Sequence, residues 1–143
     1  MAQVTRIITS AIITNSQQKF LIVKRAANDT YPNMWEFPGG TSEFGEHPED
    51  SVIREIFEET GLVIIPEYPV VVNSYKSKSK SDPVNVEIFY ISSLTPLDQT
   101  VTLSNEHSDY AWIELEKIED YETTEYIHKV IKQTKKLLRA LNS

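Results

Sequence analysis

Three glutamates in one short stretch have the residue type and the spacing to hold a metal ion. Glu55, Glu58 and Glu59 stand at positions i, i+3 and i+4. On a helix their side chains fall within one arc of about 100°. Each pair of like charges so placed repels by about a few tenths of a kcal/mol, so a nearby positive charge is expected. Hard cations such as Mg²⁺ and Mn²⁺ prefer carboxylate and carbonyl oxygens. The stretch therefore predicts a cation site, and a solvated acidic face is the alternative.

Two neighbouring features favour the cation site. Arg54 stands beside the glutamates, where its guanidinium could pair with one carboxylate and fix its orientation. The dipeptide Gly39-Gly40 lets the backbone approach the helix, so that a carbonyl could be a further ligand. Mg²⁺ and Mn²⁺ are commonly recruited to polyphosphates, where they polarise phosphoryl oxygens and activate water. The expected chemistry is attack of water on a phosphoanhydride.

The whole chain limits the classes of protein to consider. Its 143 residues, 40% of them hydrophobic, predict one globular domain over residues 1–143. A net charge of -7 argues against non-specific binding to nucleic acids or anionic membranes. The absence of cysteine excludes disulfides and thiolate metal sites. With no apolar run of spanning length and no signal-peptide pattern, the expected location is cytoplasmic. The oligomeric state stays open, with a homodimer as one alternative.

Strands and two helices in mixed order predict the α+β class, arranged as an α/β/α sandwich. Strands are expected at 4–14, 20–23, 35–37, 63–75, 84–92 and 110–113, and helices at 48–60 and about 124–141. Pro48 suits the first helical turn, and Gly61 suits the position just past the end. The alternating Lys and Ser residues at 76–81 predict a turn, and a flap over a phosphate ligand is the alternative.

The first helix is expected to have one apolar and one acidic face. On a helical wheel the apolar side chains cover about 140° and the glutamates lie on the opposite arc. The apolar set is Val52, Ile53, Ile56 and Phe57. We expect this set to pack on the sheet and the acidic face to look away from it.

The same residues resemble a known motif. Gly40, five residues, Glu46, seven residues and then the run from Arg54 to Leu62 match the Nudix box, GX5EX7REUXEEXGU, at every fixed position. The chain is thus identified as similar to the Nudix hydrolases of the MutT-like kind. The resemblance implies a mixed β-sheet between helices, and hydrolysis of a nucleoside diphosphate linked to another group.

The resemblance also implies roles for individual residues. The metal ligands would be the Gly40 carbonyl, Glu55, Glu58, Glu59 and, from a later loop, Glu106. Glu55 or Glu106 would be the general base, so the catalytic set is Arg54, Glu55, Glu58 and Glu106. Arg54 would orient a catalytic glutamate, and Glu46 would stabilise the motif rather than take part in the reaction. Arg25 would bind a substrate phosphate, or else be an ordinary charge at a strand end. His107 is interpreted as a loop histidine, and contact with the substrate is the alternative.

The substrate class is inferred from the absence of sequence features that are typical of other subfamilies. The ADP-ribose, dinucleoside-polyphosphate and coenzyme A hydrolases of this family each have a mark of their own outside the motif, and this chain lacks these marks or has them only in part. The remaining hypothesis is a Mg²⁺- or Mn²⁺-dependent pyrophosphohydrolase that converts a nucleoside or deoxynucleoside triphosphate to the monophosphate and pyrophosphate. The alternatives are a hydrolase of ADP-ribose or another nucleoside diphosphate conjugate, and a nucleotide-binding module without catalysis. Capped or triphosphorylated RNA is disfavoured by the net charge.

Overall fold

The computed structural model describes residues 4–76 and 83–143. Its elements are β1 (Thr5–Thr14), β2 (Phe20–Arg25), β3 (Trp35–Glu36), β4 (Gly39–Thr41), α1 (Pro48–Thr60), β5 (Ile64–Lys76), β6 (Val84–Leu94), β7 (His107–Ile113), a 3-10 helix at Leu115–Asp120 and α2 (Tyr126–Leu141). The predicted turn at 76–81 lies almost entirely outside the described residues. None of the helices in the described part of the chain is long and apolar enough to cross a membrane.

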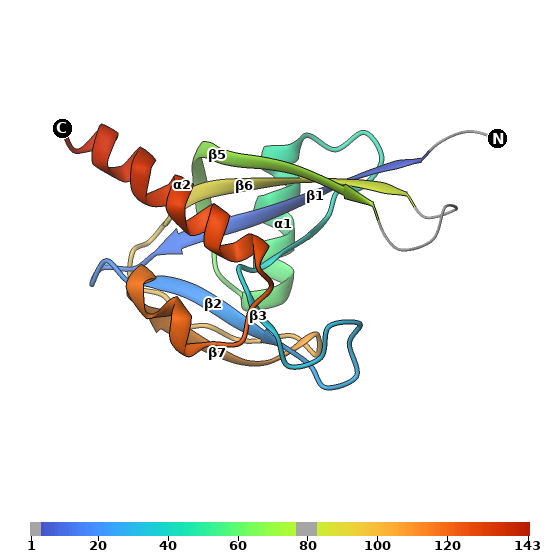
Figure 1. The fold of residues 1–143 in the computed structure, drawn as a ribbon, viewed down its shortest axis with the longest axis horizontal. Coiled ribbons are helices and arrows are strands. Elements are labelled where there is room, and N and C mark those ends of the chain that lie inside the picture. The colour runs from blue at the N-terminus through green and yellow to red at the C-terminus, as the bar shows by residue number, and fades with distance from the viewer. Residues whose placement is uncertain (1–3, 77–82) are drawn as a thin grey trace.

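The strands form one mixed sheet between the two helices, as the sequence predicted (Figure 1). The order is β3-β2-β1-β6-β5, with β4 also paired to β1 and β7 paired to β2. β1 and β6 run parallel, and every other strand pair is antiparallel. β1 meets β2 only near the turn that joins them, at the pair Thr14 and Phe20. Beyond that point β1 pairs with β4, which places the two glycines of β4 beside the centre of the sheet.

Two apolar clusters hold the helices to opposite faces of this sheet. Val52 and Ile56 of α1 are fully buried with Ala11 and Ile13 of β1. Side chains of α2 pack on the other face, among them Val130, which is also fully buried. Because side chains alternate along a strand, odd-numbered β1 residues face α1 and even-numbered ones face α2.

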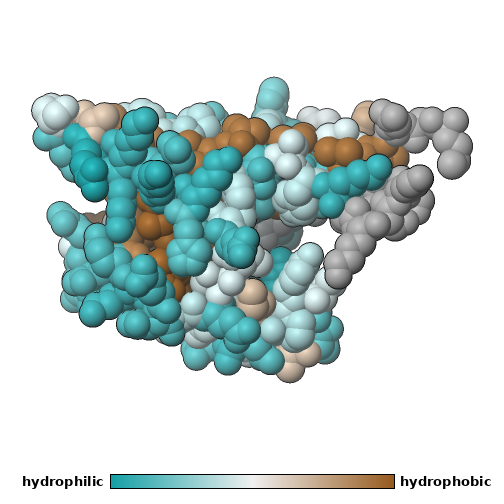
Figure 2. Space-filling model, in the orientation of Figure 1, coloured by the Kyte–Doolittle hydropathy of each residue, from teal (hydrophilic) through white to brown (hydrophobic). Residues whose placement is uncertain are grey.

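The face of the molecule drawn in Figure 2 is mostly polar, with apolar side chains along its upper edge. In Figure 2 the hydrophobic side chains gather along the upper edge, where Figure 1 places β5. The exposed apolar residues of this strand include Ile65 and Val72. The register of β5 against β6 shifts near Pro66 and Pro69, because proline has no N–H to donate to the neighbouring strand.

The bounds of α1 confirm the sequence prediction. Pro48 occupies the first turn, and Glu49 follows it near the positive end of the helix dipole. Gly61 ends the helix with a φ of 71°, and its N–H donates to the carbonyl of Phe57 at 2.9 Å. That left-handed conformation is one that glycine adopts without strain.

Candidate functional site

β4 brings the backbone of two glycines against the acidic side of α1. The Gly39 N–H donates to Oε2 of Glu59 at 3.0 Å. A Cβ atom on Gly40 would collide with the carboxylate of Glu55. A side chain at position 40 would therefore displace Glu55, and glycine permits the close approach.

The expectation that the acidic face looks away from the sheet is wrong for Glu59. This side chain is 5% exposed, because β4 and the loop before β7 cover it. The expectation is also wrong for Phe57, which is 57% exposed although the wheel placed it on the packed face. A wheel gives the direction of a side chain but not which element lies in that direction. The helix therefore buries one carboxylate of its acidic face and exposes one apolar side chain of the face expected to pack.

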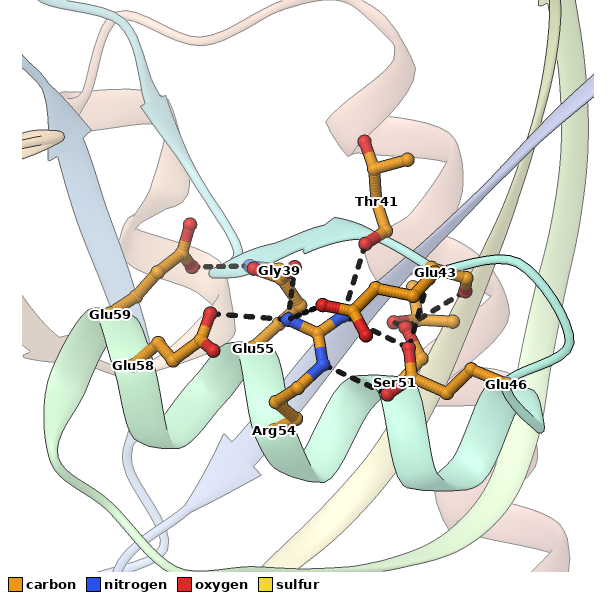
Figure 3. A network of polar contacts seen from close by, with 11 residues as sticks. Gly39, Thr41, Glu43, Glu46, Ser51, Arg54, Glu55, Glu58 and Glu59 are labelled. Carbon is orange, nitrogen blue, oxygen red and sulfur yellow. Dashed lines mark hydrogen bonds and ion pairs between the residues drawn. The ribbon is translucent and has the colours of Figure 1, made fainter.

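Arg54 is the centre of a polar network at the middle of α1 (Figure 3). Its Nε and Nη2 donate to the two carboxylate oxygens of Glu46 at 2.8 and 2.9 Å. Nη1 donates to Glu55 at 2.9 Å and to Glu58 at 3.1 Å. Nη2 also donates to the carbonyl of Thr41 at 3.2 Å, which ties the guanidinium to β4. These contacts fix the orientation of Glu46, Glu55 and Glu58 from one planar group.

The charges in this network shift the pKa values of its members. The Arg54 guanidinium, helped by the N–H of Glu43, lowers the pKa of Glu46 to about 2. Burial raises the pKa of Glu55, an effect that Arg54 opposes. Glu46 is thus a firmly ionised partner for Arg54, whereas Glu55 takes up a proton more readily than an ordinary glutamate.

A polar cavity of about 390 Å³ opens beside the two glycines. Its walls are formed by Arg25, Asp29, Glu36, Gly39, Gly40, Thr41, Glu55, Glu59, Glu106 and His107. Five of the predicted site residues therefore lie together, namely Arg25, Gly40, Glu55, Glu59 and Glu106. Arg54 contacts this wall through the carboxylate of Glu55 and the carbonyl of Thr41. Glu58 is not part of this wall, and its side chain is 57% exposed.

The loop that carries Glu106 is attached to both sides of the cavity. The N–H of Ser104 donates to the carbonyl of Glu59 at 3.0 Å, at the end of α1. The N–H of Ala26 donates to the carbonyl of Glu106 at 3.1 Å. These backbone bonds bring Glu106 to the buried carboxylate from a position 47 residues further along the chain, as 106 minus 59 gives.

Glu59, Glu106 and His107 offer ligand atoms that all lie within 4.8 Å of one another. Burial raises the pKa of Glu59 to about 10, and Glu106 adds to this shift, followed by Glu55. Such a carboxylate becomes stable in its ionised form only with a positive charge beside it. Several carboxylates, a glycine carbonyl and at most one imidazole form a donor set that fits Mg²⁺ or Mn²⁺.

His107 is a buried residue at the start of β7 rather than a loop histidine, and Glu36 is a site residue that the sequence did not reveal. His107 is buried, and its Nε2 lies 3.1 Å from Oε2 of Glu36. Its Nδ1 is buried without a hydrogen-bond partner in the described part of the chain. The one sequence signal for His107 is its position next to Glu106. Nothing in the sequence signals that Glu36, 71 residues away, lies against it.

Arg25 lies in the cavity wall, but its charge already has partners. The guanidinium donates to Asp29 and to Glu36, each at 2.9 Å. It also lies 5.7 Å from the ring centre of Tyr31. A contact between Arg25 and a substrate phosphate therefore stays a prediction.

Comparison with known proteins adds sequence and structural relatives. The model of the NUDIX domain family matches residues 4–134. An 8-oxo-dGTP diphosphatase of Escherichia coli is 46% identical over 55 residues, which cover 38% of this chain and 43% of that protein. The matches to the next curated relatives likewise span less than half of their length.

Solved structures extend the likeness to nearly the whole chain. A MutT protein from Methanosarcina mazei Go1 superimposes with a TM-score of 0.80 at 25% identity, over 95% of this chain and 96% of that one. The ORF135 protein of E. coli shares the fold, with a TM-score of 0.77 at 21% identity, over 96% of this chain and 94% of that one. With the family model matching residues 4–134, the chain belongs to the NUDIX domain family.

Proposed function

We propose that this chain is a Mg²⁺- or Mn²⁺-dependent pyrophosphohydrolase that converts a nucleoside or deoxynucleoside triphosphate to the monophosphate and pyrophosphate. The observation that carries the proposal is the convergence of Glu55, Glu59 and Glu106 with the Gly40 backbone on one polar cavity. The diphosphatase of E. coli that resembles this chain has a nucleoside triphosphate in its name, which supports the same substrate class.

The roles follow from the donor set. Glu59, Glu106, Glu55 and the Gly40 carbonyl are the proposed ligands, and Glu58 joins them by turning from its exposed position. When bound, the cation supplies positive charge against the phosphate oxygens and activates water for attack. Either Glu55 or Glu106 accepts the proton that the water loses. The water oxygen bonds to the α- or the β-phosphorus, and cleavage of the bridging P–O bond gives the same two products.

A product-resolved nucleotide panel tests this proposal. The purified protein with Mg²⁺ is expected to release pyrophosphate and a monophosphate from at least one nucleoside or deoxynucleoside triphosphate, as separated by ion-exchange chromatography. The panel includes ADP-ribose, a dinucleoside tetraphosphate and 5′-triphosphorylated RNA. Release of AMP and ribose phosphate from ADP-ribose, with no product from any triphosphate, would instead indicate a hydrolase of nucleoside diphosphate conjugates. Binding of nucleotides without any product, in Mg²⁺ or Mn²⁺, would make it a binding module.

Arg54→Lys is expected to lower kcat by about tenfold, because a group that orients metal ligands typically contributes a factor of this size. Lysine keeps the positive charge but cannot reach the two oxygens of Glu46 and the carboxylate of Glu55 with one planar group. Steady-state kinetics at varied Mn²⁺ provide the measurement, and the apparent Mn²⁺ affinity should fall in parallel. Unchanged kcat and affinity would show that charge alone suffices at this position.

A further inference from the structure

One buried side chain in the wall of the polar cavity has no place in the ligand set proposed above. The side chain of His107 is 4% exposed, although the neighbouring residue Glu106 is exposed. The other two histidines of the chain, His47 and His128, are both exposed. A buried imidazole needs a partner at each ring nitrogen, because an unpaired polar atom loses the water that it had before burial.

The two ring nitrogens of His107 differ in their partners. Nε2 lies 3.1 Å from Oε2 of Glu36, and a carboxylate only accepts, so Nε2 carries the proton that is donated. In the neutral imidazole this tautomer leaves a lone pair on Nδ1. Nδ1 is buried and has no hydrogen-bond partner within residues 4–76 and 83–143. A lone pair on an imidazole nitrogen is a common ligand of divalent cations.

Glu36 is itself fixed from the other side. Nε and Nη2 of Arg25 each lie 2.9 Å from Oε1 of Glu36, while Oε2 accepts from the imidazole. Both oxygens of the carboxylate are therefore held, and the plane of the His107 ring is held with them. A histidine that binds a metal almost always donates its other N–H to a carboxylate, a carbonyl or water, which fixes its tautomer and orientation. Glu36 and His107 have this arrangement.

The carboxylates that would share a cation with His107 are close to it. Glu59, Glu106 and His107 each offer one ligand atom, and the three atoms lie within 4.8 Å of one another. Ligands at about 2.1 Å from an octahedral cation are separated by about 3 Å when adjacent and about 4 Å when opposite. The exposed side chain of Glu106 can make the small movement that reaches this spacing.

A nitrogen donor changes which cation the site prefers. Mg²⁺ takes oxygen ligands in a nearly ideal octahedron, and imidazole suits the first-row transition metals better. Carboxylate and carbonyl oxygens also suit Mn²⁺. A donor set of several oxygens and one imidazole therefore favours Mn²⁺ or Co²⁺ over Mg²⁺.

We propose that His107 is a ligand of the cation through Nδ1, and that the site consequently prefers Mn²⁺ to Mg²⁺. Glu36 is then a positioning residue, because it acts on the cation only through the ring of His107. This inference rests on the proposed function and adds a nitrogen donor to its oxygen ligands.

Pulsed electron paramagnetic resonance of Mn²⁺ added to the purified protein, without nucleotide, tests the nitrogen ligand directly. We expect the coupling of a directly bound imidazole nitrogen in the wild-type protein and its loss in His107→Gln. The coupling should persist in His47→Gln and in His128→Gln. Because the chain has three histidines, persistence in these two controls assigns the nitrogen to His107 even if His107→Gln does not fold. Mn²⁺ bound without nitrogen coupling, or no bound Mn²⁺, would overturn the inference.

Calorimetric titrations with Mn²⁺ and with Mg²⁺ test the preference. In His107→Gln the ratio of Mn²⁺ affinity to Mg²⁺ affinity should fall by at least about tenfold, since this variant replaces the nitrogen donor. Glu36→Gln should lower the Mn²⁺ affinity by about tenfold, as for other partners of a metal-bound histidine. It should lower the Mg²⁺ affinity less, a difference that a general loosening of the fold would not produce. An affinity ratio unchanged in His107→Gln would contradict the role of His107.

The two proposals fail in different ways. Nitrogen-coupled Mn²⁺ in a protein that hydrolyses no triphosphate would overturn the hydrolytic proposal alone. Release of pyrophosphate from a triphosphate, with bound Mn²⁺ that shows no nitrogen coupling, would overturn the role of His107 alone.

Discussion

Glu59→Gln is expected to lower kcat by about a thousandfold, because it removes the most buried carboxylate from the proposed cation site. The amide keeps the size of the side chain and the capacity to accept from the Gly39 N–H, at 3.0 Å in the wild-type protein. The loss should therefore come from charge rather than from a displaced β4. Steady-state kinetics over a range of Mg²⁺ and Mn²⁺ concentrations provide the measurement, and high cation concentration should not restore turnover.

The same substitution has a consequence for stability in the metal-free protein. The folded pKa of Glu59 is raised to about 10, above the ordinary value of 4.5. The folded state thus binds this proton more tightly than the unfolded state does. The stabilisation that this proton gives the folded state is complete below pH 4.5 and is lost as the pH rises towards 10. Between these limits the free energy of unfolding should fall by up to about 1.4 kcal/mol per pH unit from this group.

Denaturant unfolding in a chelator at pH 6, 7 and 8 measures this slope. In Glu59→Gln the slope should be smaller, because the group that titrates is gone. Mg²⁺ should raise the melting temperature of the wild-type protein at pH 8 and have little effect on the variant, since ligand binding stabilises only the state that binds it. Equal pH slopes in the two proteins would contradict the raised pKa of Glu59. An equal response to Mg²⁺ would contradict the assignment of Glu59 as a ligand.

Glu58→Gln is expected to lower kcat by at least about a hundredfold without destabilising the fold. Its carboxylate is largely exposed and lies 3.1 Å from Nη1 of Arg54, so its removal leaves no buried gap. Glu49→Gln, an exposed acid in the first turn of the same helix, is the matched control for loss of one negative charge. Near-normal turnover in Glu58→Gln, with kinetics like those of the control, would remove Glu58 from the ligand set.

Local sequence signals predicted most of the fold. Pro48 and Gly61 marked the ends of α1 because each favours a backbone conformation that is required there. β4 was not predicted, because two of its three residues are glycines, which have a low strand propensity. The short helix at 115–120 was not predicted either, since six residues are too few to show a clear helical period.

The candidate site was predictable where its residues are close in sequence and not where they come together only in the fold. The motif identified Gly40, Arg54 and the glutamates of α1 as candidate site residues. The burial of Glu59 depends on β4 and on the loop before β7. A helical wheel of α1 includes neither of these segments. The pairing of His107 with Glu36 depends in the same way on the arrangement of strands distant in sequence.

The glycine pair of β4 also matters for redesign. Gly39 touches Ser10 on the α2 side of the sheet, while Gly40 touches Glu55 on the α1 side. The dipeptide should therefore stay unchanged in any library of variants, since a methyl group at Gly39 would collide with Ser10 and one at Gly40 with the carboxylate of Glu55.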